Sequence, residues 1–297
     1  MGRRDAARFP PIGDHETIVC MLMQVRLETV DCPCCESKGH RHWASENGYD
    51  AVKCTRCGTV YIRERPRRED ISAAARDGVH PTEDGVLDQR LHRQGWKVPF
   101  YAGIVRRFFE GEKGLRWLDV GAGNGEFVEA VQRALPDAEA MGIDPMKVKV
   151  ACAQKRSVPI TAQTLEEVTG SYDVISIINV FSHIPDFQHF GRLIRARLKP
   201  GGSLFIETGN GGDLPSRADY PGELLLPDHL VFSGIEQMKQ TLGRLGFGRV
   251  EHFSRRTDHP LWAAKQMVKG ALKGRPRVFI PWTRKFRTIF YRAYLDG

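Results

Sequence analysis

Between residues 115 and 255, short apolar runs alternate with segments in which apolar residues recur every three or four positions. The β-rich apolar runs occupy positions 115–120, 138–143, 172–178, 203–207 and 249–253. The helical patterns lie between them, at 126–135, 146–156, 187–198 and 234–245. Strands that alternate with helices at this spacing form a parallel, doubly wound sheet. We therefore predict an α/β fold with a Rossmann-like, mostly parallel sheet.

The rest of the chain divides into segments of different composition. Residues 1–28 show no clear periodicity and are assigned to an N-terminal extension. Residues 29–66 are dense in Cys, Gly, Pro and charge but too short for an apolar core. Residues 67–110 predict a linker and a helical approach to the α/β domain, which we place at 111–256. Residues 257–297 predict basic amphipathic helices, and no seventh, antiparallel strand is evident after Phe253.

The net charge of +8 is concentrated near the carboxyl terminus. Residues 252–297 carry eleven Lys and Arg against two Asp, or +9, so the rest sums to −1. The predicted helices place Leu261, Val268 and Leu272 on a face flanked by lysines. We favour packing on the body with a solvated basic edge; contact with an anionic membrane and binding of phosphate-bearing substrates stay open. No apolar run is long enough to span a membrane, and the sequence shows no secretory signal. We therefore expect a cytoplasmic protein. Peripheral contact with the inner face of the membrane is the alternative.

Two Cys-x-x-Cys pairs, Cys32 with Cys35 and Cys54 with Cys57, are separated by 18 residues. Each pair supplies two thiolates from one tight turn, and structural zinc is bound by four such ligands in a tetrahedron. Cys34 is interpreted as a spectator. A redox role is disfavoured because neither pair opens a helix of a βαβ unit. We predict a structural zinc ribbon over residues 29–66.

A glycine-rich turn follows the first apolar run of the α/β region. Gly121, Gly123 and Gly125 alternate with other residues, which lets the backbone turn sharply and approach a ligand closely. A dinucleotide site would have its third glycine at position 126, but Glu126 stands there and would repel a pyrophosphate. Asp119 adds a second negative charge beneath the loop. The loop therefore favours S-adenosylmethionine (SAM) over NAD.

Asp144 ends the next apolar run, about 20 residues after the glycines. An acid at this place in a Rossmann-like fold accepts hydrogen bonds from ribose hydroxyls. A helix N-cap is the alternative role for such a residue. Its position at a strand end behind a glycine loop favours the ribose.

These motifs resemble those of class I SAM-dependent methyltransferases, in particular the ubiquinone-type O-methyltransferase branch. The resemblance covers residues 115–253 and rests on the segments 119–125, 164–167, 172–175, 179–186 and 198–207. It implies a SAM site whose residues are Asp119, Gly121, Ala122, Gly123, Asn124, Gly125, Asp144, Pro145, Thr164, Leu165 and Asn179.

The ribbon segment 52–61 is similar to the metal-binding leader of some of these enzymes, which are tied to bacterial polysaccharide, deoxysugar and natural-product pathways. The zinc-containing sugar C-methyltransferases share this domain order but carry a large further C-terminal domain that this chain lacks. The resemblance implies a small-molecule or glycan acceptor and SAM with structural zinc as cofactors.

Three residues are candidates for catalysis. His229 and Asp228 lie in a loop at the expected carboxyl edge of the sheet, where the resembling families place a histidine over the substrate. His183 follows the apolar run 172–178. A histidine that titrates near neutrality suits removal of a hydroxyl proton. Loop packing or capping is the alternative role for His229. His15, His80, His92 and His189 have no supporting context and are interpreted as surface residues.

The sequence thus predicts methyl transfer to a hydroxyl or carbon of a sugar, glycan or natural-product intermediate. An RNA methyltransferase, which would grip RNA with the ribbon and tail, is the runner-up. It loses ground because Asn179 is not followed by the Pro-Pro-aromatic pattern of base-amine methylation. A non-catalytic SAM-binding scaffold is the third hypothesis.

Overall fold

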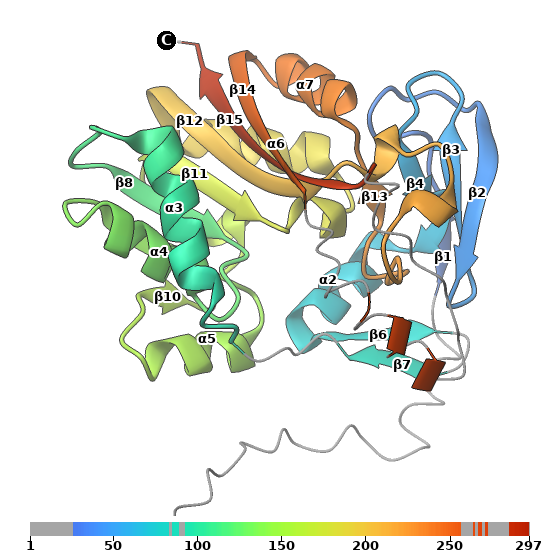
Figure 1. The fold of residues 1–297 in the computed structure, drawn as a ribbon, viewed down its shortest axis with the longest axis horizontal. Coiled ribbons are helices and arrows are strands. Elements are labelled where there is room, and N and C mark those ends of the chain that lie inside the picture. Colours follow the sequence, from blue (N-terminus) through green and yellow to red (C-terminus); the bar gives the residue numbers. More distant parts are fainter. Residues whose placement is uncertain are drawn as a thin grey trace, which may run out of the picture.

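The fold is built on a seven-stranded central sheet with the strand order β10-β9-β8-β11-β12-β15-β14 (Figure 1). The computed structural model describes residues 26–82, 85–88, 93–256 and 285–296, and helical positions 264, 267–268 and 271–272. The sheet strands are β8 (Arg116–Val120), β9 (Glu139–Ile143), β10 (Ile160–Thr161), β11 (Tyr172–Ile178), β12 (Leu198–Gly209), β14 (Phe247–Arg256) and β15 (Arg287–Leu295). All five predicted runs form strands, and the mostly parallel α/β fold is confirmed.

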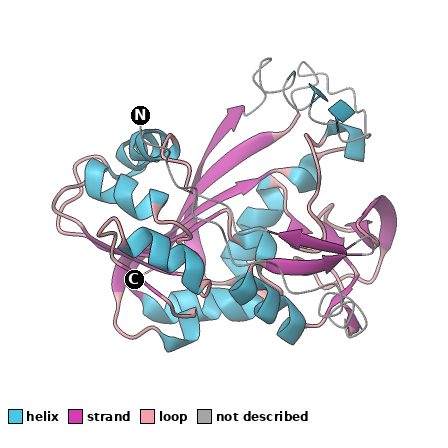
Figure 2. Cartoon of the chain, turned by 90° about the horizontal axis from the view of Figure 1, so that it is seen from below, coloured by secondary structure: helices cyan, strands magenta, loops and turns pink. Residues whose placement is uncertain are grey.

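Helices cover both faces of this sheet (Figure 2). One apolar core packs α3 (Lys97–Phe109), α4 (Glu126–Ala134) and α5 (Lys147–Gln154) against one face. A second core packs α6 (Phe187–Arg197) and α7 (Ile235–Arg244) against the other. Successive side chains of a strand point to opposite faces of the sheet. In β11, Val174 accordingly belongs to the first core, whereas Ile175 and Ile177 belong to the second. The four predicted helices of this region are confirmed to within two residues at each end.

The carboxyl-terminal part corrects one prediction. Residues 287–295 form β15, which pairs antiparallel with β12 on one side and with β14 on the other. A central strand buries both of its faces, and Ile289, Phe290, Tyr291 and Ala293 are all at most 1% exposed. The prediction of a helix over residues 287–295 was therefore wrong. The apolar spacing that suggested a helix arises because both faces of this strand are buried. The antiparallel strand that was not evident from the sequence is therefore β15, and the two-residue strand β10 was not among the predicted runs either.

The predicted helix around residues 261–273 lies largely outside the described residues. Positions 264, 267–268 and 271–272 are helical, and Val268 and Leu272 are 59% and 83% exposed. In the part of the chain that the structure describes, no helix is both long enough and apolar enough to cross a membrane.

The cysteine-rich segment forms a second, antiparallel sheet of β2 (His40–Glu46), β3 (Tyr49–Cys54) and β4 (Val60–Ile62). A two-residue strand from the α/β region, β13 (Val231–Phe232), joins its edge by pairing with β4 (Figure 1). Short pairs β1 (Leu27–Thr29) with β5 (Glu64–Pro66) and β6 (Val79–Thr82) with β7 (Gly85–Asp88) flank α2 (Arg68–Asp77). The predicted linker thus contains a helix and a hairpin before α3. We call residues 29–66 the ribbon.

Candidate functional site

The glycine loop joins β8 to α4 at the carboxyl edge of the sheet. All three glycines have positive φ, and the N–H groups of Gly121 and Ala122 donate to the carbonyl of Ile143 at 2.8 and 2.9 Å. A Cβ at Gly121 would lie 2.5 Å from Cγ2 of Val180, whereas one at Gly123 would meet nothing closer than 3.9 Å. The loop is therefore tightly packed at its base and open at Gly123, where a ligand can approach the backbone.

Asp144 lies against this opening. Its carboxylate accepts hydrogen bonds from the N–H groups of Gly123 and Met146, both at 2.8 Å, and the residue is 7% exposed. Burial raises its pKa, while these two bonds and the charge of Lys149 act in the opposite direction. Each carboxylate oxygen has a second lone pair. The arrangement fits ribose hydroxyls placed over Gly123, as the sequence predicts.

Asp119 is buried beneath the loop and accepts a 2.6 Å hydrogen bond from Ser176 Oγ. Ser176 Oγ in turn accepts from Trp117 Nε1 at 2.9 Å. Burial raises the pKa of Asp119 to about 8, although the bond from Ser176 opposes the shift. A cationic ligand above the loop would favour the ionised carboxylate.

Glu207, near the end of β12, is a further buried acid that the sequence analysis did not select. Its carboxylate accepts from Tyr101 Oη and from Asn179 Nδ2, both at 2.9 Å. Burial raises its pKa to about 7, while the hydrogen bond from Tyr101 and the charges of Lys97 and Arg255 oppose the shift. The sequence does contain a signal for this residue, because Glu207 ends the predicted strand 203–207 and so lies at the carboxyl edge of the sheet.

The remaining predicted cofactor residues surround the same edge. Thr164 caps the 3₁₀ turn η1 (Leu165–Glu167), and its N–H donates to Glu167 Oε2 at 2.7 Å. Leu165 is 3% exposed and Asn124 is 7% exposed, whereas Pro145 is half-buried. Asn179 has a left-handed backbone with φ 57° at the end of β11. These residues lie at the carboxyl edge of the sheet, and Leu165 is also part of the apolar core.

A group of histidines surrounds Asp228. His183, at the end of the 3₁₀ turn η2 (Phe181–His183), has Nδ1 2.9 Å from Asp228 Oδ1. His80 from β6 has Nε2 at 2.9 Å from the same oxygen. The rings of His183 and His229 are 4.7 Å apart, edge to face. The predicted trio is therefore assembled, and His80 joins it.

His80 was interpreted as a surface residue, and that is wrong: it is 5% exposed. A buried imidazole needs a hydrogen-bond partner, and Asp228 supplies one. No local pattern around residue 80 indicates this contact, because its partner lies 148 positions away in the sequence.

The electrostatics of this group are set by the Asp228 carboxylate. Burial alone would lower the pKa of His183, but the charge and hydrogen bonds of Asp228 outweigh it and raise the pKa. Burial acts to raise the pKa of Asp228, and the nearby histidines hold it well below its usual range. Burial and the charge of His183 lower the pKa of His229 to about 4. His229 is therefore neutral near pH 7, and its Nδ1 lies 2.8 Å from the carbonyl of Leu224.

The histidine group adjoins the glycine loop. Val180, which packs on Gly121, is three residues before His183 in the same segment. The positive charge of Lys149 in α5 acts to lower the pKa of Asp144 and that of His183, against the net upward shift of each. With Nδ1 facing Asp228, His183 has Nε2 available, and its side chain is 33% exposed. The two parts can hold a cofactor and a second reactant side by side.

The four predicted metal ligands form one cluster. Their Sγ atoms all lie within 4.8 Å of one another, with Cys32 to Cys57 at 3.5 Å and Cys35 to Cys54 at 3.6 Å. A zinc–sulfur bond of about 2.3 Å in a tetrahedron places sulfurs about 3.8 Å apart. The cluster thus fits zinc. Cys34 is not one of these four, and its Sγ lies 3.1 Å from Thr241 Oγ1 of α7.

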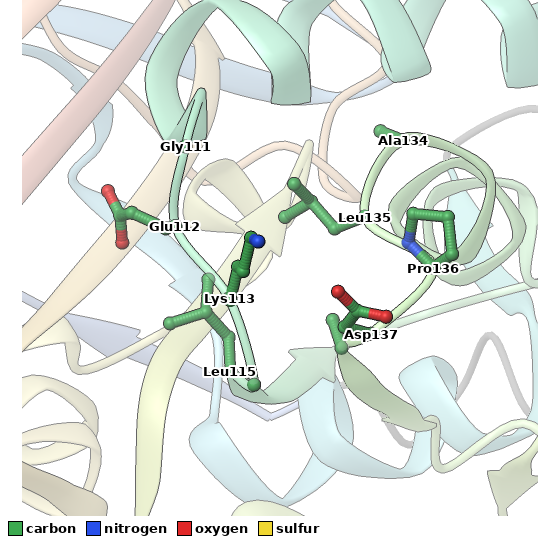
Figure 3. A pocket seen from close by; sticks show the side chains of 10 residues that line it. Gly111, Glu112, Lys113, Leu115, Ala134, Leu135, Pro136 and Asp137 are labelled. Atoms are coloured by element: carbon green, nitrogen blue, oxygen red, sulfur yellow. The ribbon is translucent and has the colours of Figure 1, made fainter.

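A cavity of about 160 Å³ lies elsewhere (Figure 3). It is lined by residues 111–115 and 134–138, which precede β8 and β9. These turns are at the amino ends of the parallel strands, opposite the glycine loop. Ligands of such sheets bind outside the carboxyl ends. This cavity is therefore no part of the site.

The chain is similar in sequence to known methyltransferases. Residues 91–252 match a family described as a methyltransferase domain. Ubiquinone biosynthesis O-methyltransferase of Escherichia coli O127:H6 is 31% identical over 128 residues, which are 40% of this chain and 52% of that protein. The same enzyme of Xanthomonas campestris pv. campestris is 34% identical over 105 residues, 33% of this chain and 44% of the other. The chain thus spans about half the length of the curated relatives it matches.

Among solved structures, phosphoethanolamine N-methyltransferase 2 of Haemonchus contortus, in complex with phosphomonomethylethanolamine and S-adenosylhomocysteine, has a TM-score of 0.52 at 15% identity. The match covers 95% of this chain and 73% of that one. At this identity the likeness concerns the fold, which is that of the class I methyltransferases.

Proposed function

Because the chain belongs to the methyltransferase domain family, we propose that it transfers a methyl group from SAM to an acceptor hydroxyl, with His183 as general base and Asp228 as its partner. One observation carries the proposal. His183 presents Nδ1 to a buried carboxylate and stands beside the glycine loop, on the segment that packs against Gly121.

The chain's own residues account for the cofactor site. The open backbone at Gly123 and the carboxylate of Asp144 would hold the ribose part. Asp119 and Glu207 are buried acids whose ionised form a cationic donor would favour. When bound there, SAM supplies a methyl group on a positively charged sulfur. Such a donor is already reactive, so the protein has to orient the acceptor and remove its proton.

His183 is suited to remove that proton. Asp228 accepts from Nδ1, which fixes the tautomer with Nε2 unprotonated, and its charge stabilises the imidazolium that forms when Nε2 takes the acceptor proton. His229 stays neutral, and with Nδ1–H donating to the carbonyl of Leu224 its Nε2 can accept one hydrogen bond to orient the acceptor. The sequence alone placed His229 first; the contacts of Asp228 favour His183.

The acceptor we propose is a hydroxyl of a sugar, glycan or natural-product intermediate. Two observations support it: the curated relatives are named as O-methyltransferases, and the ribbon is similar to the leader of enzymes in such pathways. We further propose that Cys32, Cys35, Cys54 and Cys57 bind structural zinc. Four thiolates leave no open coordination position, so this zinc would not take part in the reaction.

Two measurements test the function. Calorimetric titration with S-adenosylhomocysteine, with NAD as the control, should show micromolar binding to the wild-type protein and none to Asp144→Ala. Labelled SAM is then offered with panels of sugar, lipid-linked glycan, phenol and RNA acceptors. Methyl transfer to a hydroxyl supports the proposal, whereas transfer to RNA would favour the runner-up. Tight cofactor binding with no product on any panel would favour a scaffold.

A further inference from the structure

One connection between the ribbon and the histidine group runs through the backbone of Leu230. The N–H of Ile62 in β4 donates to the carbonyl of Leu230 at 2.9 Å, and the N–H of Leu230 donates to the carbonyl of Ser182 at 2.7 Å. Ser182 lies in η2, directly before His183. Asp228 and His229 immediately precede this bridge. The ribbon sheet therefore supports both sides of the histidine group.

A second connection starts from Glu46, the last residue of β2. Its carboxylate accepts from the N–H of Leu224 at 3.0 Å through Oε2 and from the N–H of Leu225 at 2.6 Å through Oε1. Arg217 Nη2 lies 3.3 Å from Oε2. The Glu46 side chain is only 9% exposed. A buried carboxylate that accepts two backbone N–H bonds is a strong local constraint.

The backbone that Glu46 holds is unusual. Leu225 has φ 63°, in the left-handed region that side chains other than glycine, asparagine and aspartate rarely adopt. The carbonyl of Leu224 accepts from His229 Nδ1, and the carbonyl of Leu225 accepts from the His229 N–H at 3.1 Å. The two residues that donate to Glu46 are therefore the two that orient His229.

We propose that Glu46 is a positioning residue of the acceptor site, through which the ribbon fixes the tautomer and orientation of His229. The inference rests on the proposed function, because it gives the ribbon a place in the same site. Without the carboxylate, Leu225 can relax to a negative φ. The carbonyl of Leu224 then turns away, and the Nδ1–H tautomer of His229 loses its acceptor.

The test compares Glu46→Gln with Asp50→Asn. Asp50 is a carboxylate of the same hairpin whose side chain is 68% exposed and pairs with His42 and Ser45 rather than with the loop. A glutamine keeps the shape of Glu46 but presents an N–H₂ group to one of the two backbone N–H donors. Three quantities are measured: hydrogen exchange of the Leu224 and Leu225 amides, nitrogen NMR shifts of the His229 ring, and steady-state kinetics with the best acceptor.

In Glu46→Gln we expect the two amides to exchange about tenfold faster or more, because each loses a charge-assisted hydrogen bond. The His229 ring should change from the Nδ1–H tautomer to a mixture. The kcat should fall about tenfold while the Kd for S-adenosylhomocysteine stays within about twofold. Asp50→Asn should match the wild type in all three measurements. If Glu46→Gln does not fold, Glu46→Asp keeps the charge, shortens the reach and should give a smaller effect of the same sign.

Unchanged amide exchange and an unchanged His229 tautomer in a folded Glu46 variant would overturn the inference. Faster exchange with wild-type kcat would also overturn it, because the loop would then be held without consequence for the site. Failure of the proposed function gives a different result. The wild type would methylate no acceptor, while the exchange and tautomer measurements would still show whether Glu46 holds the loop.

Discussion

Replacing Asp228 with asparagine isolates the charge behind His183. The substitution keeps the shape of the side chain and one acceptor oxygen, but removes the negative charge that His183 and His80 both face at 2.9 Å. Asp228 is 8% exposed, so water cannot replace that charge effectively. His183 would have to become positively charged during the reaction without a counter-charge.

The expected loss follows from this one interaction. A hydrogen bond to a charged group contributes about 1.5–3 kcal/mol, and every 1.36 kcal/mol corresponds to a factor of ten in rate. We therefore expect the kcat of Asp228→Asn to fall roughly 10- to 100-fold. The affinity for S-adenosylhomocysteine should change little, because Asp144 and the glycine loop make no contact with Asp228 in the described hydrogen bonds.

The pH dependence gives a second, signed expectation. A base must be unprotonated, so activity should rise with pH through the pKa of His183, which Asp228 raises against the effects of burial and Lys149. Removing the charge lowers that pKa, so the rising limb should move to lower pH while the plateau falls. His229, with a pKa of about 4, is already neutral over this range.

The assay is methyl transfer from labelled SAM at saturating acceptor, from pH 5.5 to 9.5. Asp219→Asn serves as the control, since Asp219 is a carboxylate of the same loop that is 8% exposed and pairs with Lys285 instead of a histidine. The reasoning is refuted if Asp228→Asn keeps the wild-type plateau, or if its rising limb moves to higher pH.

Three further predictions concern the cofactor site and the ribbon. Gly121→Ala should weaken S-adenosylhomocysteine binding at least about tenfold in calorimetry. The added Cβ would lie 2.5 Å from Val180, and residue 121 has a positive φ that alanine rarely adopts. Wild-type affinity would contradict the tight packing of the loop. The ratio of SAM affinity to S-adenosylhomocysteine affinity should rise roughly three- to tenfold between pH 6 and 9. The reason is that Glu207 and Asp119, with pKa values of about 7 and 8, become charged beside the sulfonium. A ratio that does not change with pH would place these acids away from the sulfur. Removing the proposed zinc, or Cys57→Ser, should lower kcat about tenfold or more with little change in cofactor Kd, because β4 follows the second cysteine pair and holds β13. Equal losses in kcat and cofactor affinity would show general unfolding.

The sequence was sufficient to predict five strands of the central sheet, because each of these strands carries its own apolar run. The apolar runs and the helices between them fall within a few residues of their observed limits. The strand β15 was missed for a physical reason. A strand buried on both faces loses the alternation of apolar and polar positions, and Arg292 within it is buried against Glu112 rather than exposed.

The two halves of the candidate site differ in how far they could be predicted. The cofactor half is made of residues at strand ends, such as Gly123 and Asp144, and parallel strands bring their carboxyl ends to one edge whatever the details of packing. The histidine half requires His80, His183 and Asp228 to meet from three separate segments. Patterns of local spacing carry no information about such meetings. His183, Asp228 and His229 could be proposed from their places in the chain, but His80 could not.

The ribbon and the loop that carries Asp228 and His229 depend on each other structurally. A two-residue strand such as β13 is too short to be stable alone and exists here only as the edge of the ribbon sheet. Asp228 and His229 lie within three residues of that strand, and Glu46 holds the turn that precedes them. The ribbon in turn is too small to bury a core of its own and packs Cys34 against Thr241 of α7. Each part therefore completes the other, and a change at the cysteine cluster should reach the acceptor side of the site before it reaches the cofactor side.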